Sequence, residues 1–150
     1  MDRVGLAWII AALPLLFLPW LLPPLTAFPK GPLSLLMSRL PGGLPGQIAY
    51  ALVVNAPVEE AYWRGALLRE KGRWSLLQHG CAFGLHHAVA AAILFPWPWV
   101  LPALLLPALA GAGWSWLARR NGGAAVPFLQ HAVADLSVLI LVACQMKTAL

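Results

Sequence analysis

The sequence predicts an all-α fold, a polytopic transmembrane bundle of about five spans. Of its 150 residues, 61% are hydrophobic and only 10% are charged, and the mean hydropathy is +0.76. A water-soluble surface needs roughly a quarter or more of its residues charged, so the composition excludes an ordinary soluble domain. Eight tryptophans support the same interpretation, because indole rings favour the headgroup level of a bilayer.

Five apolar runs predict the spans, since a helix needs about 20 apolar residues to cross the hydrocarbon core. We expect the first run to be a retained span that its prolines kink or break. We divide the chain into an N-terminal helix and loop, residues 1–43, and a core, residues 44–150, and the loop includes a short interfacial helix at 33–40. The five predicted spans cover residues 5–27, 44–68, 74–95, 100–118 and 124–145.

Turns are predicted where the apolar runs end. Residues 69–73 carry a cluster of charges, 96–99 read Pro-Trp-Pro-Trp, and 121–123 read Asn-Gly-Gly. Within the second run we expect Pro57 to bend the helix just before Glu59, because proline removes a backbone donor and clashes with the preceding turn.

The basic residues indicate orientation rather than nucleic-acid binding. The net charge is +5, and the arginines and lysines cluster in short loops between apolar runs. With five spans, six of them fall on the side of the N-terminus and three on the other. The positive-inside rule then places the N-terminus in the cytoplasm.

Ionisable residues inside the predicted spans are candidates for function, because a charge at membrane depth costs several kcal/mol. The whole chain has only five acidic residues, and two of them, Glu59 and Glu60, are adjacent. A single intramembrane histidine often only bonds helix to helix, and we favour that role for His79. The full set is Glu59, Glu60, Arg64, His79, His86, His87, His131 and Asp135.

Spacing within each helix predicts which of these residues meet. Glu60 and Arg64 are four apart and can form an ion pair, which leaves Glu59 as the freer carboxylate. The same spacing places Phe83 and His87 on one face of the third run, and His131 and Asp135 on one face of the fifth. We expect the three helices to form one inward-facing site that opens to the cytoplasm.

Hydrolysis is the chemistry that this set of residues suggests. A carboxylate beside a histidine can deprotonate and position a water, and a histidine from another helix can donate to the developing oxyanion. That mechanism requires no cofactor. Glu59, His87 and His131 could equally hold a divalent metal such as zinc, and the sequence does not separate the two. His86 is treated as packing or as a further metal ligand.

Three motifs in order resemble the CPBP family of intramembrane proteases, which includes the type II CAAX prenyl endopeptidases and bacteriocin-processing or Abi-like immunity proteins. They are Glu59-Glu60-x-x-x-Arg64-Gly65, Phe83-x-x-x-His87 and His131-x-x-x-Asp135. The segment from Gly113 to Gly122 also resembles the one before the family's last motif. The likeness covers about residues 52–140.

The resemblance implies a role for each motif residue. Glu59 would be the catalytic base, His87 would help to hold the water, and Glu60 with Arg64 would be a supporting ion pair. His131 and residue 135 would stabilise the oxyanion. Asp135 replaces the commoner asparagine of the family. Because an ionised carboxylate cannot donate a hydrogen bond, Asp135 must be protonated or must orient His131 instead.

We therefore predict an intramembrane endopeptidase of the glutamic type that acts on a membrane-associated protein or peptide, with no nucleic-acid partner. The substrate could be a prenylated C-terminus, a leader peptide or a C-terminal sorting tail. We expect the protein in a bacterial inner membrane, with its active site open to the cytoplasm. A chain this short could also form a homo-oligomer. One alternative is a non-catalytic immunity or scaffold protein of the same fold, and a less favoured one is a proton or metal transporter.

Overall fold

The computed structural model describes residues 42–68 and 74–147, and the regular secondary structure in these residues is entirely helical. The predicted all-α class is therefore confirmed for this part of the chain. The first apolar run, the interfacial helix at 33–40 and the charged turn at 69–73 lie outside the described residues. The elements are α4 (Gly43–Tyr50), η3 (Ala51–Asn55), α5 (Ala56–Glu60), η4 (Ala61–Leu67), α7 (Leu76–Leu94), α8 (Trp97–Asn121) and α9 (Ala125–Lys147).

The described residues fall into two compact units, which we consider separately. One comprises residues 42–57 and 128–147, and the other comprises 58–68 and 74–127. The first unit thus holds α4, η3 and most of α9. The second holds most of α5, with η4, α7 and α8. The predicted domain boundary after residue 43 remains a prediction.

The prediction of five spans is not confirmed. Within the described residues, Trp97–Asn121 is the one helix long and apolar enough to cross a membrane, and Ala125–Ile140 is a shorter apolar stretch. The first run lies outside the described residues, the second is divided among short α- and π-helical segments, and polar residues lower the hydropathy of the others. Three histidines and a glutamine lower the mean hydropathy of α7, and the second run contains both glutamates and Arg64.

The second apolar run is an irregular helix. Its backbone is π-helical over Ala51–Asn55 and again over Ala61–Leu67, with a short α-helical stretch between them. Where a bend was predicted at Pro57, the helix is π-helical immediately before Ala56. Proline cannot donate to the preceding turn, and a wider turn is one way to accommodate it. Glu59 and Glu60 therefore lie between two π-helical segments, a kind of distortion that is frequent at functional sites.

Helix α7 has well-defined ends. Ser75 is its N-cap, and its hydroxyl accepts a hydrogen bond from the Gln78 backbone while the Gln78 side chain accepts one from the Ser75 backbone. This reciprocal capping box satisfies backbone donors that a helix start otherwise leaves unpaired. The helix ends at Leu94, and Phe95 is extended.

Helix α8 starts earlier than the sequence indicated. Pro96 is its N-cap and the helix begins at Trp97, so the predicted turn at 96–99 is wrong for most of its length. Proline is tolerated in the first turn of a helix because the donor that it lacks has no partner there. The Asn-Gly-Gly turn is confirmed, because α8 ends at Asn121 and Gly122 is left-handed, with φ 69°.

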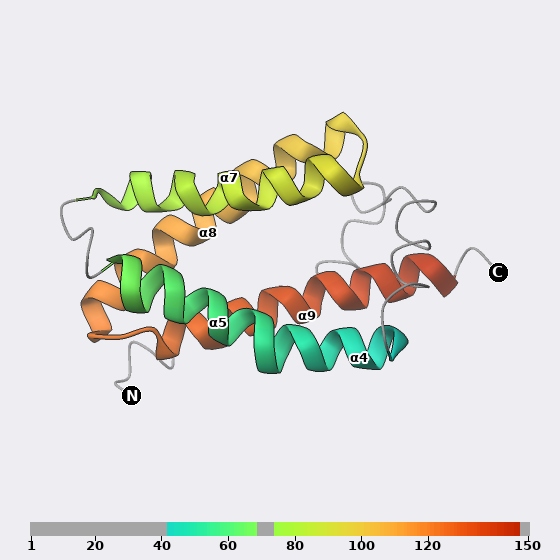
Figure 1. Cartoon of the computed structure of the whole chain (residues 1–150), viewed down its shortest axis with the longest axis horizontal. Helices are drawn as coiled ribbons and strands as arrows, with labels where there is room; N and C mark the ends of the chain where they lie inside the picture. Colours follow the sequence, from blue (N-terminus) through green and yellow to red (C-terminus); the bar gives the residue numbers. More distant parts are fainter. Residues whose placement is uncertain (1–41, 69–73, 148–150) are drawn as a thin grey trace. The chain divides into compact units, whose positions relative to one another are not determined.

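Helices α7 and α8 lie side by side (Figure 1), and small residues bring their backbones close together. A Cβ atom added to Gly80 would lie 2.4 Å from the Ala108 carbonyl oxygen, and one added to Gly84 would lie 2.4 Å from that of Leu104. Small residues four apart allow this close approach in membrane proteins. They give the second unit a closely packed helix pair, and its α7 helix carries Phe83 and His87 of the second motif.

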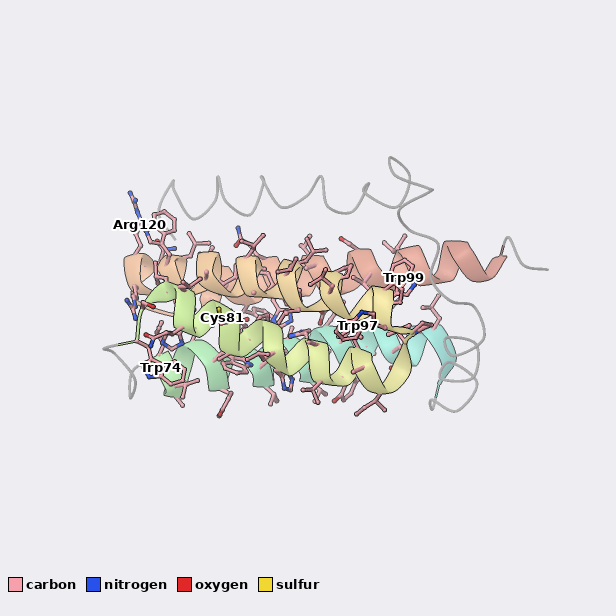
Figure 2. All side chains as sticks on the ribbon, turned by 90° about the horizontal axis from the view of Figure 1, so that it is seen from above. Trp74, Cys81, Trp97, Trp99 and Arg120 are labelled. Carbon is pink, nitrogen blue, oxygen red and sulfur yellow. The ribbon has the colours of Figure 1, made fainter. Side chains whose placement is uncertain are left out.

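Tryptophans mark both ends of this helix pair. Figure 2 shows Trp74 and Arg120 at one end, and Trp97 and Trp99 at the other. Arg119 also donates a hydrogen bond from Nη2 to the Trp74 carbonyl oxygen, at 2.6 Å. Aromatic residues at both ends of a helix and basic residues at one end are typical of segments that reach a membrane–water interface.

Candidate active site

A buried ion pair between Glu60 and Arg64 forms the centre of the second unit. The Arg64 Nη1 atom donates to Glu60 Oε1 at 2.7 Å, and the two residues are 3% and 1% exposed. The pairing predicted from their spacing is thus present. A buried charge requires a partner of this kind, because its desolvation is not otherwise compensated.

Arg64 also connects η4 to α7 and α8 through a hydrogen bond and two ring contacts. Its Nη2 atom donates to the Gly111 carbonyl oxygen at 3.2 Å. Its guanidinium carbon lies 4.5 Å from the centre of the Phe83 ring and 5.3 Å from that of Trp114. Aromatic faces attract a cation, and more strongly when water is excluded. Arg64 is therefore held by a carboxylate, a main-chain carbonyl and two rings.

Phe83 connects this ion pair to His87. Phe83 is 2% exposed, and its ring lies against Gly111, where an added Cβ atom would approach within 2.9 Å. The centres of the Phe83 and His87 rings are 4.4 Å apart. The phenylalanine of the second motif thus packs between the Arg64 guanidinium and the imidazole.

One hydrogen bond defines which His87 nitrogen carries the hydrogen. Nδ1 lies 2.9 Å from the Phe83 carbonyl oxygen, and a carbonyl can only accept, so Nδ1 carries the hydrogen. In a neutral imidazole Nε2 then has the lone pair. Metal-binding and catalytic histidines are commonly oriented in this way, and Nε2 of His87 can accept a hydrogen bond from water or bind a metal.

Glu59 lies close to the second histidine of α7. The distance from its Oε1 atom to His86 Nε2 is 3.9 Å, with side-chain exposures of 16% for Glu59 and 56% for His86. The His86 ring also contacts Trp63 and His87, with centres 6.0 and 5.4 Å apart. The sequence left His86 as either a packing residue or a further metal ligand. In the structure it is an exposed neighbour of Glu59, the proposed catalytic base.

The third motif belongs to the first unit and has its own partner there. His131 is 2% exposed, and its Nε2 atom lies 3.5 Å from Asp135 Oδ1. Asn55, from η3, donates from Nδ2 to the other carboxylate oxygen of Asp135 at 3.4 Å. Asp135 therefore faces an imidazole on one oxygen and a carboxamide on the other.

The two units account for all the residues predicted for the site. The second unit brings together the first two motifs, and the first unit brings together His131 and Asp135. Three contributors were missed, Asn55, Gly111 and Trp114. An asparagine inside an apolar run was the one sequence signal for Asn55, whereas Gly111 acts through its backbone. His79, expected to bond between helices, is buried and packs against Trp74 with ring centres 5.4 Å apart.

The donor atoms of the three motifs suit metal chemistry as well as acid–base chemistry. Glu59 and His87 of the second unit and His131 of the first offer one carboxylate and two imidazoles, which are residue types that bind metal ions. Two histidines and a glutamate are also a known ligand set of catalytic zinc. The residue types therefore fit both interpretations that the sequence left open.

The described helices carry the three motifs in which the sequence resembles membrane-embedded endopeptidases of the CAAX type. A scan against family models gives the same answer. The model described as type II CAAX prenyl endopeptidase Rce1-like matches residues 41–137. This is more than half of the chain, so the protein belongs to that family. No curated protein and no solved structure matched the chain.

Proposed function

We propose that the protein is an intramembrane endopeptidase that hydrolyses a peptide bond of a membrane-associated substrate with a water activated by Glu59 and His87. The observation that carries this proposal is the family match, since residues 41–137 include all three motifs. The local geometry supports it, because Arg64 neutralises Glu60 and the Phe83 carbonyl orients His87.

In the proposed mechanism Glu59, His87 and His131 converge on one water beside the scissile carbonyl. The Glu59 carboxylate takes a proton from the water while Nε2 of His87 accepts its other hydrogen. The water oxygen attacks the carbonyl carbon, and His131 donates to the resulting oxyanion, usually the largest catalytic contribution. When the C–N bond breaks, Glu59 returns its proton to the leaving amine.

The same residues would hold zinc if the enzyme is metal-dependent. Glu59, His87 and His131 would be the ligands, and the metal would acidify a bound water. The two versions differ in one respect that can be measured. Prolonged treatment with a strong chelator abolishes activity in the metal-dependent version and leaves it unchanged in the other.

A prenylated C-terminal peptide is the first substrate to test, because the matching family model describes prenyl endopeptidases. Leader peptides and C-terminal sorting tails are the other proposed classes. Opening of the site to the cytoplasm of a bacterial inner membrane would agree with the distribution of basic residues.

The deciding experiment compares wild type with Glu59→Gln in proteoliposomes that contain a farnesylated CAAX peptide, alongside terminal proteomics of host cells that express each version. Glu70→Gln makes the same change outside the motifs and is the matched control. New peptide termini that appear with wild type and Glu70→Gln but not with Glu59→Gln support the endopeptidase. Identical termini from all three, with normal complementation by Glu59→Gln, would favour the scaffold protein.

A further inference from the structure

The Asp135 carboxylate connects two side chains that are far apart in the sequence. Asn55 and Asp135 are separated by 80 positions, and Nδ2 of Asn55 donates to Oδ2 of Asp135. The other oxygen, Oδ1, faces Nε2 of His131. All three residues belong to the same unit, so this chain of contacts is a feature of that unit alone.

Nothing in the local sequence requires an asparagine at position 55. Its neighbours in η3 are Ala51, Leu52, Val53 and Val54. Asparagine is a weak helix former, and its amide is costly to bury without hydrogen bonds. A residue that is unfavourable for the helix therefore makes a specific contact with the third motif.

The directions of these contacts determine what Asp135 does. An amide nitrogen can only donate, so Asp135 is the acceptor toward Asn55. Oδ2 accepts from Asn55, and Oδ1 lies 3.5 Å from Nε2 of His131, so the amide restrains the rotamer of a carboxylate that faces the imidazole. The interpretation that Asp135 orients His131 thereby gains a structural basis.

We infer that Asn55 is a positioning residue of the proposed endopeptidase. Its carboxamide holds the Asp135 carboxylate, which in turn holds the His131 ring. The inference rests on the proposed function, because it assigns Asn55 to the group that supports the oxyanion donor. Asn55 itself touches neither water nor substrate in this role.

Three variants at this contact separate positioning from simple packing. Asn55→Leu keeps the side-chain volume and removes the hydrogen bond, and we expect kcat to fall about tenfold or more with KM within about twofold, as for loss of a hydrogen bond to a charged group. Asn55→Asp places two carboxylates against each other, and we expect its kcat to fall further than that of Asn55→Leu. Adding Asp135→Asn to Asn55→Asp restores an amide–carboxylate contact, and we expect about tenfold recovery. Gln47→Leu removes a carboxamide from α4 of the same unit, and kcat stays unchanged.

A spectroscopic measurement reports on His131 directly. In protein with ¹⁵N-labelled histidine, assigned with a His131→Gln sample, Asn55→Leu shifts the His131 ring resonances and leaves those of the other three histidines in place. Thermal unfolding in detergent is recorded for every variant. A merely structural asparagine would lower the unfolding temperature without this selective shift.

The outcomes distinguish this inference from the proposed function. If wild type cleaves the peptide and Asn55→Leu retains kcat within about twofold, Asn55 is not a positioning residue. The same conclusion follows if activity falls only in proportion to lost folded protein and the exchanged pair restores nothing. If wild type itself cleaves no substrate, the proposed function fails, and an unshifted His131 resonance in Asn55→Leu would then overturn the contact as well.

Discussion

Replacing Arg64 with methionine would test whether the buried ion pair holds the second unit together. Methionine keeps most of the aliphatic stem but removes the charge. Glu60, which is 1% exposed, would then lose the cation with which it forms its ion pair. The substitution also removes the donor to the Gly111 carbonyl and the cation that lies over the Phe83 and Trp114 rings.

The expected effect is large because the carboxylate stays behind. Breaking a buried ion pair by removing one partner costs about 3–5 kcal/mol. The lost hydrogen bond to the Gly111 carbonyl costs about 1–3 kcal/mol when counted alone. Since neighbouring contributions are not additive, we expect the free energy of unfolding to fall by about 4 kcal/mol in total.

Removal of both charges should be less damaging than removal of one. In the double variant Glu60→Leu with Arg64→Met no buried charge is left uncompensated, and replacement of a whole buried pair by apolar residues is often close to neutral. We therefore expect the double variant to be more stable than Arg64→Met alone, by about 2 kcal/mol or more.

Denaturation in detergent micelles, followed by tryptophan fluorescence for wild type, both single variants and the double variant, gives the four free energies of this cycle. The reasoning would be refuted if Arg64→Met unfolded with wild-type stability. It would also be refuted if the double variant lost the sum of the two single losses, because the two charges would then be energetically independent.

The other predictions concern helix packing and capping. Gly84→Ala should destabilise the α7–α8 pair by about 1–3 kcal/mol through overpacking, because the new Cβ atom meets the Leu104 carbonyl oxygen at 2.4 Å. The control Gly113→Ala meets nothing within 4 Å and should stabilise by up to about 1 kcal/mol through helix propensity; equal effects at both sites, measured by unfolding in detergent, would contradict the packing argument. Ser75→Ala should cost about 1 kcal/mol by removing the cap of α7, and faster amide exchange confined to the first turn of that helix would confirm it.

The sequence predicted those parts of the site that depend on a single helix. Glu60 with Arg64, Phe83 with His87, and His131 with Asp135 each lie four residues apart, and the helical repeat alone brings such residues together. The observed contacts within these three pairs follow that expectation. Composition was likewise sufficient for the all-α class.

The contacts between distant segments could not be predicted in this way. The hydrogen bond from Arg64 to Gly111 ends on a main-chain atom, which leaves no mark in the sequence. Asn55 reaches Asp135 across 80 positions, and helical spacing has no information about such pairs. The number of spans could not be predicted from composition either, because polar site residues reduce the hydropathy of the helices that carry them.

The π-helical segments on either side of the glutamates have a consequence for alignment and for engineering. In an α-helix each residue advances the chain by about 100° around the axis, and a π-bulge corresponds to one additional residue in a turn. Deletion of a single residue between Ala51 and Asn55 would convert that segment to a regular turn and leave the residues on its two sides facing as before. Conversion of the segment to α-helix at constant length would instead rotate one side relative to the other by about 100°, and Glu59 would then face a new direction although its own sequence context was intact. In this stretch of the chain, the length of the segment is therefore as informative as the identity of its residues.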